Sequence, residues 1–258
     1  MIYSYRDNPD ERLRLEALER ALDPGSIELL RRLGVGRGWR CLEVAAGAGS
    51  VARWLANEGA EVAALDVDLS AFREHPDERI RLIEADIRDA DCRPVHDLVH
   101  ARCVLDVVDD PGGVMDAMAA ATKPGGLLLL EEFDDVSAAV AVGEEQLHNA
   151  VVTARQQIWR ERGLDPNQGR TLLRALRLRG FVGRGAEGRV LIREGGTREA
   201  DSWRRSVLAL RGALTSTGLV TNGDVDTYLL LLDNRDFSWF SAVIVAAWGR
   251  RERREGSV

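Results

Sequence analysis

The chain has 258 residues, of which 45% are hydrophobic and 30% are charged, a balance typical of a packed globular domain rather than a disordered chain. Its formal net charge is −7, whereas a protein that binds nucleic acid in general carries a basic face. We therefore expect no nucleic-acid partner.

The ends and apolar runs of the chain carry no sign of export or of a membrane anchor. The N-terminal stretch MIYSYRDNPDERLR is charged and lacks the apolar region of a signal peptide. No stretch reaches the roughly 18–20 unbroken apolar residues that a membrane span needs. We expect residues 1–258 to form a single cytoplasmic domain that makes no membrane contact and is a monomer or a homodimer.

The N-terminal region predicts two helices. From Asp10 to Leu22, leucines recur at near-helical spacing with charges on the other face. Asp23-Pro24-Gly25 predicts an end to this helix, and a second helix is expected from Ser26 to Gly34.

The middle of the chain alternates short apolar runs with helical patterns. The runs are continuous rather than alternating, which is typical of parallel strands covered on both faces. Strands that alternate with helices predict an α/β fold with a doubly wound, mostly parallel sheet. The expected strands are 39–46, 61–67, 79–86, 96–105 and 126–133, and the expected helices are 51–59 and 112–122.

The last part of the chain contains more residues than such a sheet needs. Its patterns predict helices at 147–163, 171–181 and 199–218, and strands at 187–194 and 240–251. We expect helical insertions at about 1–21, 136–163 and 195–236 to form a cap over the crevice. Aromatic residues in or next to these segments favour an enclosed apolar pocket: Tyr3, Tyr5, Trp159, Trp203, Trp239 and Phe240.

A glycine turn follows the first expected strand, in the stretch CLEVAAGAGS at 41–50. Read from Gly47, it fits the dinucleotide fingerprint G-x-G-x-x-G/A. Read from Glu43, it is E-x-A-x-G-x-G, which is one residue away from a turn that binds S-adenosylmethionine (SAM). These few residues alone leave both ligands open.

Acidic residues end successive strands. Asp66 suits the ribose of either ligand, and Glu43 is the acid that discriminates between them. Asp66 follows the second strand, where a carboxylate can accept hydrogen bonds from ribose hydroxyls, and Asp86 follows the third, where it could accept from an adenine amino group. Glu43 stands beside the turn and would repel a pyrophosphate, but it suits the positive charges of SAM. The carboxyl ends of parallel strands meet at one crevice, so we expect a SAM site there.

In these motifs the sequence resembles a class I SAM-dependent methyltransferase of the small-molecule, natural-product type. The glycine turn, ALDVD, EADI, DLVHARCVL and KPGGLLLLEEFD occur in the order of that family's motifs. The terminal FSAVIVAAWGRR is similar to its antiparallel last strand. The resemblance covers most of the chain and implies a seven-stranded sheet in the order 3-2-1-4-5-7-6, with SAM as the cofactor.

The chain departs from this family at two positions. Ala45 stands where the family usually has its first glycine, and we expect SAM binding to survive this change. Val107 lies where an L-x-H histidine is common. The residues that the resemblance assigns to cofactor binding are Glu43, Ala45, Gly47, Gly49, Asp66, Val67, Asp86, Ile87, Ala101 and Arg102.

Candidates for catalysis and for substrate binding lie near the fourth and fifth strands and in the cap. His100 is a candidate general base. Glu131 follows the fifth strand, and the Asp-Asn partner of a metal-dependent methyltransferase is missing, so we expect no metal site. The candidate substrate-binding residues are Tyr3, Glu131, Trp159 and Trp203.

The predicted function is methyl transfer from SAM to an oxygen, nitrogen or carbon nucleophile on a small, partly apolar molecule. One alternative is a protein of the same fold that binds SAM without transferring its methyl group, such as a cyclase or a binding protein. Another is an NAD-dependent oxidoreductase, although no Tyr-x-x-x-Lys pair is present and Lys123 sits in a Lys-Pro-Gly-Gly turn.

Overall fold

A seven-stranded sheet forms the centre of the protein in a computed structural model that describes residues 8–91, 93–138, 140–198 and 200–253. The strand order is β3-β2-β1-β4-β5-β10-β7, and β10 runs antiparallel to both of its neighbours. This confirms the predicted fold class and sheet order. The strands are β1 (Arg40–Val44), β2 (Glu61–Asp66), β3 (Ile80–Glu84), β4 (His96–Arg102), β5 (Thr122–Asp134), β7 (Phe181–Arg189) and β10 (Val243–Arg251).

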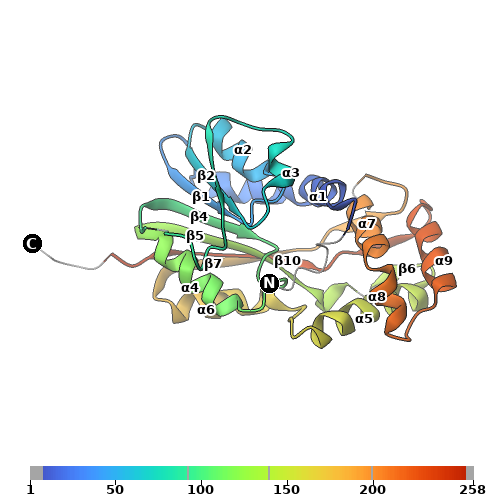
Figure 1. Cartoon of the computed structure of the whole chain (residues 1–258). Helices are drawn as coiled ribbons and strands as arrows, with labels where there is room; N and C mark the ends of the chain where they lie inside the picture. The colour runs from blue at the N-terminus through green and yellow to red at the C-terminus, as the bar shows by residue number, and fades with distance from the viewer. Residues whose placement is uncertain (1–7, 92, 139, 199, 254–258) are drawn as a thin grey trace, which may run out of the picture.

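Helices cover both faces of this sheet (Figure 1). One face packs against α1 (Glu11–Arg32), α2 (Ser50–Asn57) and α3 (Ser70–Arg73), and the other against α4 (Pro111–Ala121), α6 (Leu172–Leu178) and the short η2 (Gln168–Thr171). Successive strand residues enter opposite layers: Cys41 joins the α1–α2 side, while Leu42 joins the α4–α6 side. Burial on both faces explains the continuous apolar runs of the sequence.

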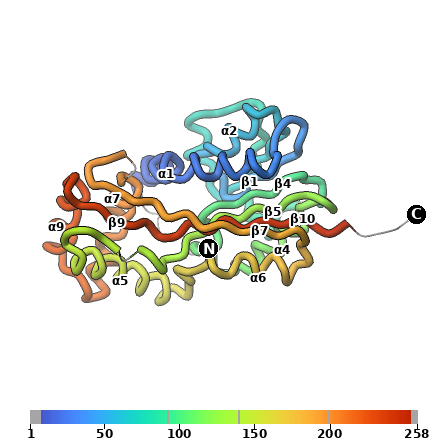
Figure 2. Tube along the Cα trace, turned by 180° about the vertical axis from the view of Figure 1, so that it is seen from behind, coloured from blue at the N-terminus to red at the C-terminus, as the bar shows by residue number. Residues whose placement is uncertain are grey.

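A second group of helices lies at one end of the sheet, apart from the helices that cover its two faces (Figures 1 and 2). We call this group and the small sheet beside it the cap. This cap has its own hydrophobic core, which includes the side chains of Trp159, Tyr228, Phe237 and Trp239. Its elements are η1 (Asp135–Ser137), α5 (Glu145–Glu161), α7 (Asp201–Ala209), α8 (Arg211–Ser216), α9 (Asn222–Leu232) and a small antiparallel sheet of β6 (Ala141–Val142), β9 (Ser238–Phe240) and β8 (Ile192–Glu194).

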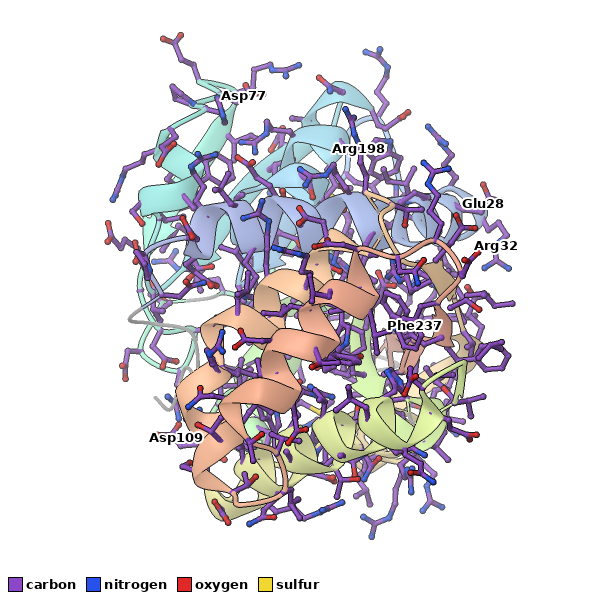
Figure 3. All side chains as sticks on the ribbon, turned by 90° about the vertical axis from the view of Figure 1, so that its right-hand side faces the viewer. Glu28, Arg32, Asp77, Asp109, Arg198 and Phe237 are labelled. Carbon is purple, nitrogen blue, oxygen red and sulfur yellow. The ribbon has the colours of Figure 1, made fainter. Side chains whose placement is uncertain are left out.

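The helix break predicted at Asp23-Pro24-Gly25 is wrong, because α1 runs through this stretch with Pro24 inside it. Leu22 and Ser26 lie on the buried side of the helix on either side of the proline, and the Ser26 hydroxyl donates to the carbonyl of Leu22. Burial on both sides offsets the proline's missing amide hydrogen bond. Seen from the cap end, α1 crosses above α7, with Glu28 and Arg32 pointing outward (Figure 3).

The expected strand at 187–194 is also corrected. The strand of the main sheet is β7, which begins at Phe181 and ends at Arg189, and the rest of the predicted strand belongs to the small sheet as β8. The glycines of β7 hide its strand character, but Gly185 is required there because a Cβ at that position would lie 2.4 Å from the ring of Trp248. Within the described ranges, no helix combines the length and the apolar character that a membrane span requires.

Candidate functional site

A cavity of about 820 Å³ opens at the carboxyl ends of the parallel strands, between the sheet, the first turns of α1 and the cap. Its sheet side is formed by the turns that follow β1, β2, β3 and β4. Its other wall comes from α1, α5, α7 and the small sheet. The lining includes Leu15, Ala45, Gly47, Asp66, Val67, Asp86, Ile87, Arg102, Cys103, Asp106, Phe133, Arg155, Trp159, Arg193, Trp203 and Trp239.

The backbone at the carboxyl ends of β1 and β4 is strained where it meets this cavity. Ala45 has φ 55° and Cys103 has φ 57°, values that side-chain-bearing residues rarely adopt. Gly47 and Gly49 also have positive φ, at 56° and 91°. The family's usual glycine at position 45 therefore has a conformational reason, and this chain holds an alanine in the same left-handed conformation.

The amides of Gly47, Gly49 and Ser50, in and after the glycine turn, are bound to protein acceptors. The Gly47 amide donates to Asp66 Oδ2 at 2.9 Å, and the Gly49 amide donates to the carbonyl of Ala46. At the start of α2, the Ser50 amide donates to Glu19 Oε1 at 3.1 Å. Two carboxylates thus occupy the place where a dinucleotide's pyrophosphate would meet backbone N–H groups and a helix N-terminus.

Asp66 and Asp86 both line the cavity, in different environments. Burial raises the pKa of Asp66, against the effect of backbone hydrogen bonds from Gly47 and Asp68. Arg88 holds both oxygens of Asp86 at 2.6 and 3.0 Å and lowers its pKa. Val67 and Ile87 follow these acids and add apolar surface to the same wall.

His100, the predicted base, lies outside the cavity lining. Its ring is fully buried between two carboxylates, with Nδ1 at 2.7 Å from Glu43 and Nε2 at 3.2 Å from Glu131, and Glu131 also binds Arg189. Burial lowers the pKa of His100, but the charges of Glu43 and Glu131 outweigh it and raise the pKa to about 9. The imidazole is therefore a buried cation at neutral pH and has no access to a substrate.

Three other predicted cofactor residues also lie outside the lining: Glu43, Gly49 and Ala101. Glu43 and Ala101 are buried. A Cβ on Gly49 would lie 2.2 Å from the ring of Phe72, so this glycine allows close packing at the start of α2. Arg102 does line the cavity, and its guanidinium binds Asp23 and Ser26 of α1, at 2.8 Å each.

The cap supplies the aromatic wall of the cavity. Trp159 and Trp203 both line it, as the sequence predicts for a substrate site, while Glu131 does not. Tyr3 lies outside the described residues. The guanidinium of Arg155 stacks on the two tryptophan rings, 5.0 Å from the centroid of Trp159 and 5.6 Å from that of Trp203.

The charged lining residues that sequence reasoning missed include Asp106, Arg155 and Arg193. Asp106 follows β4, so the rule that sites lie at strand ends could have found it. Arg155 lies four residues before Trp159 and so shares its helix face. Arg193 sits on β8, whose pairing with β9 depends on contacts that are distant in sequence. Among the described residues, no group of three or more histidines, cysteines or acids could hold a metal ion.

A sequence profile of the methyltransferase domain matches residues 5–183, from the N-terminal segment to the start of β7. The chain belongs to the methyltransferase domain family. SAM is the methyl donor of that family. No curated protein matches this methyltransferase chain by sequence.

Solved structures share the fold of this methyltransferase domain at low sequence identity. Phosphoethanolamine N-methyltransferase 2 of Haemonchus contortus, bound to phosphomonomethylethanolamine and S-adenosylhomocysteine, has a TM-score of 0.61 and 15% identity; the alignment covers 98% of this chain and 60% of that one. The 1,6-didemethyltoxoflavin-N1-methyltransferase of Burkholderia thailandensis has a TM-score of 0.54 and 15% identity, covering 96% and 84%.

A structure that is not named as a methyltransferase has a similar score. The [4+2]-cyclase SpnF has a TM-score of 0.53 and 17% identity, covering 91% of this chain and 82% of its own. The chain spans only 60% of the length of the Haemonchus enzyme. At these identities the likeness concerns the fold.

Proposed function

We propose that the protein transfers a methyl group from SAM to a small, partly apolar acceptor held under the cap. The observation that carries this proposal is the occupied glycine turn beside Asp66. The amides of Gly47 and Ser50 are bound to Asp66 and Glu19, so at these two positions a ligand meets a carboxylate rather than a free N–H donor.

The residues on the sheet side fit SAM by the chemistry of their donor and acceptor groups. The carboxylates of Asp66 and Asp86 would accept from the ribose hydroxyls and the adenine amino group, and Val67 and Ile87 offer apolar surface to a purine. When bound, SAM supplies a methyl group on a positively charged sulfur that is already activated for transfer. A wall rich in carboxylates favours such a cation.

The same wall disfavours a dinucleotide. A pyrophosphate at the start of α2 would face the carboxylates of Asp66 and Glu19 and would find no free amide at Gly47 or Ser50. The sequence predicts this repulsion from Glu43, but the Glu43 carboxylate is bound to His100 instead. The preference for SAM over NAD therefore rests on Asp66 and Glu19.

The cap side of the cavity would bind and position the methyl acceptor. Trp159, Trp203 and Trp239 give it an apolar wall above the strand ends. Holding two reactants in line can contribute about 7–11 kcal/mol to a reaction. We do not propose His100 as a base, because both of its nitrogens are held by carboxylates outside the cavity.

Calorimetry with SAM, S-adenosylhomocysteine and NAD tests the cofactor. We expect micromolar-scale binding of the first two and none of NAD. Asp66→Ala should weaken SAM binding by about 1–3 kcal/mol, because the ribose hydroxyls lose a charged acceptor. The exposed Asp116→Asn, which also removes one negative charge, is the control and should bind SAM normally. Tight NAD binding without SAM binding would refute the proposal.

Formation of S-adenosylhomocysteine across a panel of amines, phenols and carbon acids tests methyl transfer itself. The competing hypothesis is a protein that binds SAM without transferring its methyl group. A protein that binds SAM tightly and forms no S-adenosylhomocysteine with any member of a broad panel would favour that hypothesis.

A further inference from the structure

Asp106 is a buried carboxylate in the wall of the cavity, and the cofactor site does not account for it. Arg155 and Trp159 of α5 are the side chains that favour its charged form. Asp106 is 5% exposed and lines the cavity. Its Oδ1 has no hydrogen-bond partner among the residues that the structure describes. An ionised oxygen of this kind is costly to bury unless a ligand completes its hydrogen bonding.

The position of Asp106 lies between the two halves of the cavity. It follows β4, and β4 pairs with β1 on one side and with β5 on the other. β1 leads into the glycine turn of the cofactor half, and β5 leads through η1 into the cap. A ligand group on Asp106 therefore lies where an acceptor would meet the cofactor half.

The charged neighbours of Asp106 include Arg155, Asp135 and Glu132. Arg155 is paired with both oxygens of Asp135, so these two charges cancel. Glu132 is fully buried, and its Oε1 accepts from the amides of Val104 and Leu105. Burial and the neighbouring Asp106 raise the pKa of Glu132 well above its usual value, which favours its neutral form.

Asp106 itself stays ionised at neutral pH. Burial raises its pKa, Arg155 opposes this, and the result is about 6. The cavity wall beside it is aromatic, with Phe133, Trp159 and Trp203. A single buried negative charge next to flat apolar surface suits a positively charged or N–H-bearing group on an apolar body.

We infer that Asp106 binds the methyl acceptor, and that the acceptor presents a basic nitrogen to this carboxylate while its apolar part packs against Trp203. This inference rests on the proposed function and narrows the acceptor to an amine-bearing molecule. It assigns binding of the acceptor, not of SAM, to Asp106.

Calorimetry on the complex with S-adenosylhomocysteine tests the inference with three probes of similar size: 2-phenylethylamine, 2-phenylethanol and 3-phenylpropionate. At neutral pH we expect the amine to bind at least about tenfold more tightly than the other two probes, because its ammonium group can form a charge-assisted hydrogen bond with Asp106. Asp106→Asn should reduce this preference to less than about threefold. Asp116→Asn makes the same change of net charge at an exposed position of α4 and should keep the preference for the amine.

Binding of S-adenosylhomocysteine separates this inference from the proposed function. Wild type and Asp106→Asn should bind it within about threefold of each other, which also reports that the variant is folded; Asp106→Ser serves in its place if the asparagine variant does not fold. Failure of wild type to bind S-adenosylhomocysteine counts against the proposed function. If wild type binds S-adenosylhomocysteine, two results overturn the inference. One is that the amine does not bind, or binds no more tightly than the alcohol or the carboxylate. The other is that the Asp106 variant keeps the preference for the amine.

Discussion

At the scale of single residues, the site combines backbone strain with buried charge. Ala45 and Cys103 adopt positive φ at the ends of adjacent strands, and both line the cavity. Strain of this kind persists only where the surrounding structure holds it in place, and it clusters at functional sites. The left-handed turn at Ala45 directs the chain toward Gly47, whose amide then reaches Asp66.

Ala45→Gly tests this strain. Because a side chain in the left-handed region costs about 1–2 kcal/mol, we expect the glycine variant to be more stable by about 0.5–1 kcal/mol. SAM affinity should change by less than about tenfold. Chemical denaturation and calorimetry measure the two effects. Ala46→Gly is the control: this neighbour is buried without positive φ and should lose stability. A large gain in SAM affinity on Ala45→Gly would instead mean that the natural site is impaired, which would favour binding without methyl transfer.

The buried pair of Glu43 and Glu131 around His100 makes stability depend on pH. The pKa of His100 in the folded protein is about 9, whereas the usual pKa of a histidine is 6.5. A raised pKa stabilises the fold fully below the unfolded value, and this contribution is lost as pH rises through about 9. We expect the free energy of unfolding of wild type to fall between neutral pH and pH values above about 9.

His100→Gln isolates this dependence from other groups that titrate at high pH. The variant should lose about 3–5 kcal/mol at neutral pH, because two buried carboxylates lose their cation. The difference in unfolding free energy between variant and wild type should shrink as pH rises. A difference that stays constant with pH would show that His100 is not charged in the folded protein.

At the scale of elements, α1 is both a wall of the cavity and a brace. Leu15 and Leu18 line the cavity, while Glu19 binds the Ser50 amide at the start of α2. Asp23 links the Ser50 hydroxyl at 2.9 Å to Arg102 at 2.8 Å. These contacts favour a fixed position for α1 from Glu19 onward.

Glu19→Ala tests the brace. The Ser50 amide would lose its acceptor, and the loss of such a helix cap costs about 0.5–2 kcal/mol. The midpoint of denaturant unfolding should fall accordingly. Glu16→Ala, on the same helix, removes a surface pair with Arg12 and should change stability by less than about 1 kcal/mol. Equal midpoints for Glu19→Ala and wild type would exclude a bracing role for this carboxylate.

The sequence predicts the elements whose pattern is local and misses those defined by distant contacts. The five parallel strands from β1 to β5 and the acids at their ends follow from apolar runs and strand-end rules, so Asp66 and Asp86 could be found. Continuation of α1 through Pro24 depends on burial against the sheet, and β7 is hidden by glycines that make room for Trp248. The burial of His100 depends on Glu131, thirty-one residues away on a neighbouring strand.

At the scale of the whole molecule, the sheet and the cap have separate hydrophobic cores, and the cavity lies between them. A chain of hydrogen bonds holds the cap together. The Trp203 indole donates to the Tyr228 hydroxyl at 2.8 Å, and this hydroxyl lies 2.7 Å from His148 Nδ1. Burial lowers the pKa of His148, so its ring is neutral. Its Nε2 donates a hydrogen bond to the carbonyl of Ala138, which leaves Nδ1 to accept a hydrogen bond from the Tyr228 hydroxyl.

Tyr228→Phe tests whether the cap unfolds independently of the sheet. The variant leaves the Trp203 indole and the His148 ring without their shared partner, which should cost the cap about 1–3 kcal/mol. Hydrogen exchange should therefore quicken in α5, α7 and α9, with β1, β4 and β5 unchanged, because regions with separate cores can open separately. Affinity for S-adenosylhomocysteine should stay within about threefold of wild type, since Asp66 and Gly47 lie outside the cap. Thr227→Ala is the control, because the Thr227 hydroxyl donates to the carbonyl of Gly223 in its own helix. Equal loss of protection in cap and sheet would show instead that the two cores form one cooperative unit and that the cavity cannot open by movement of the cap alone.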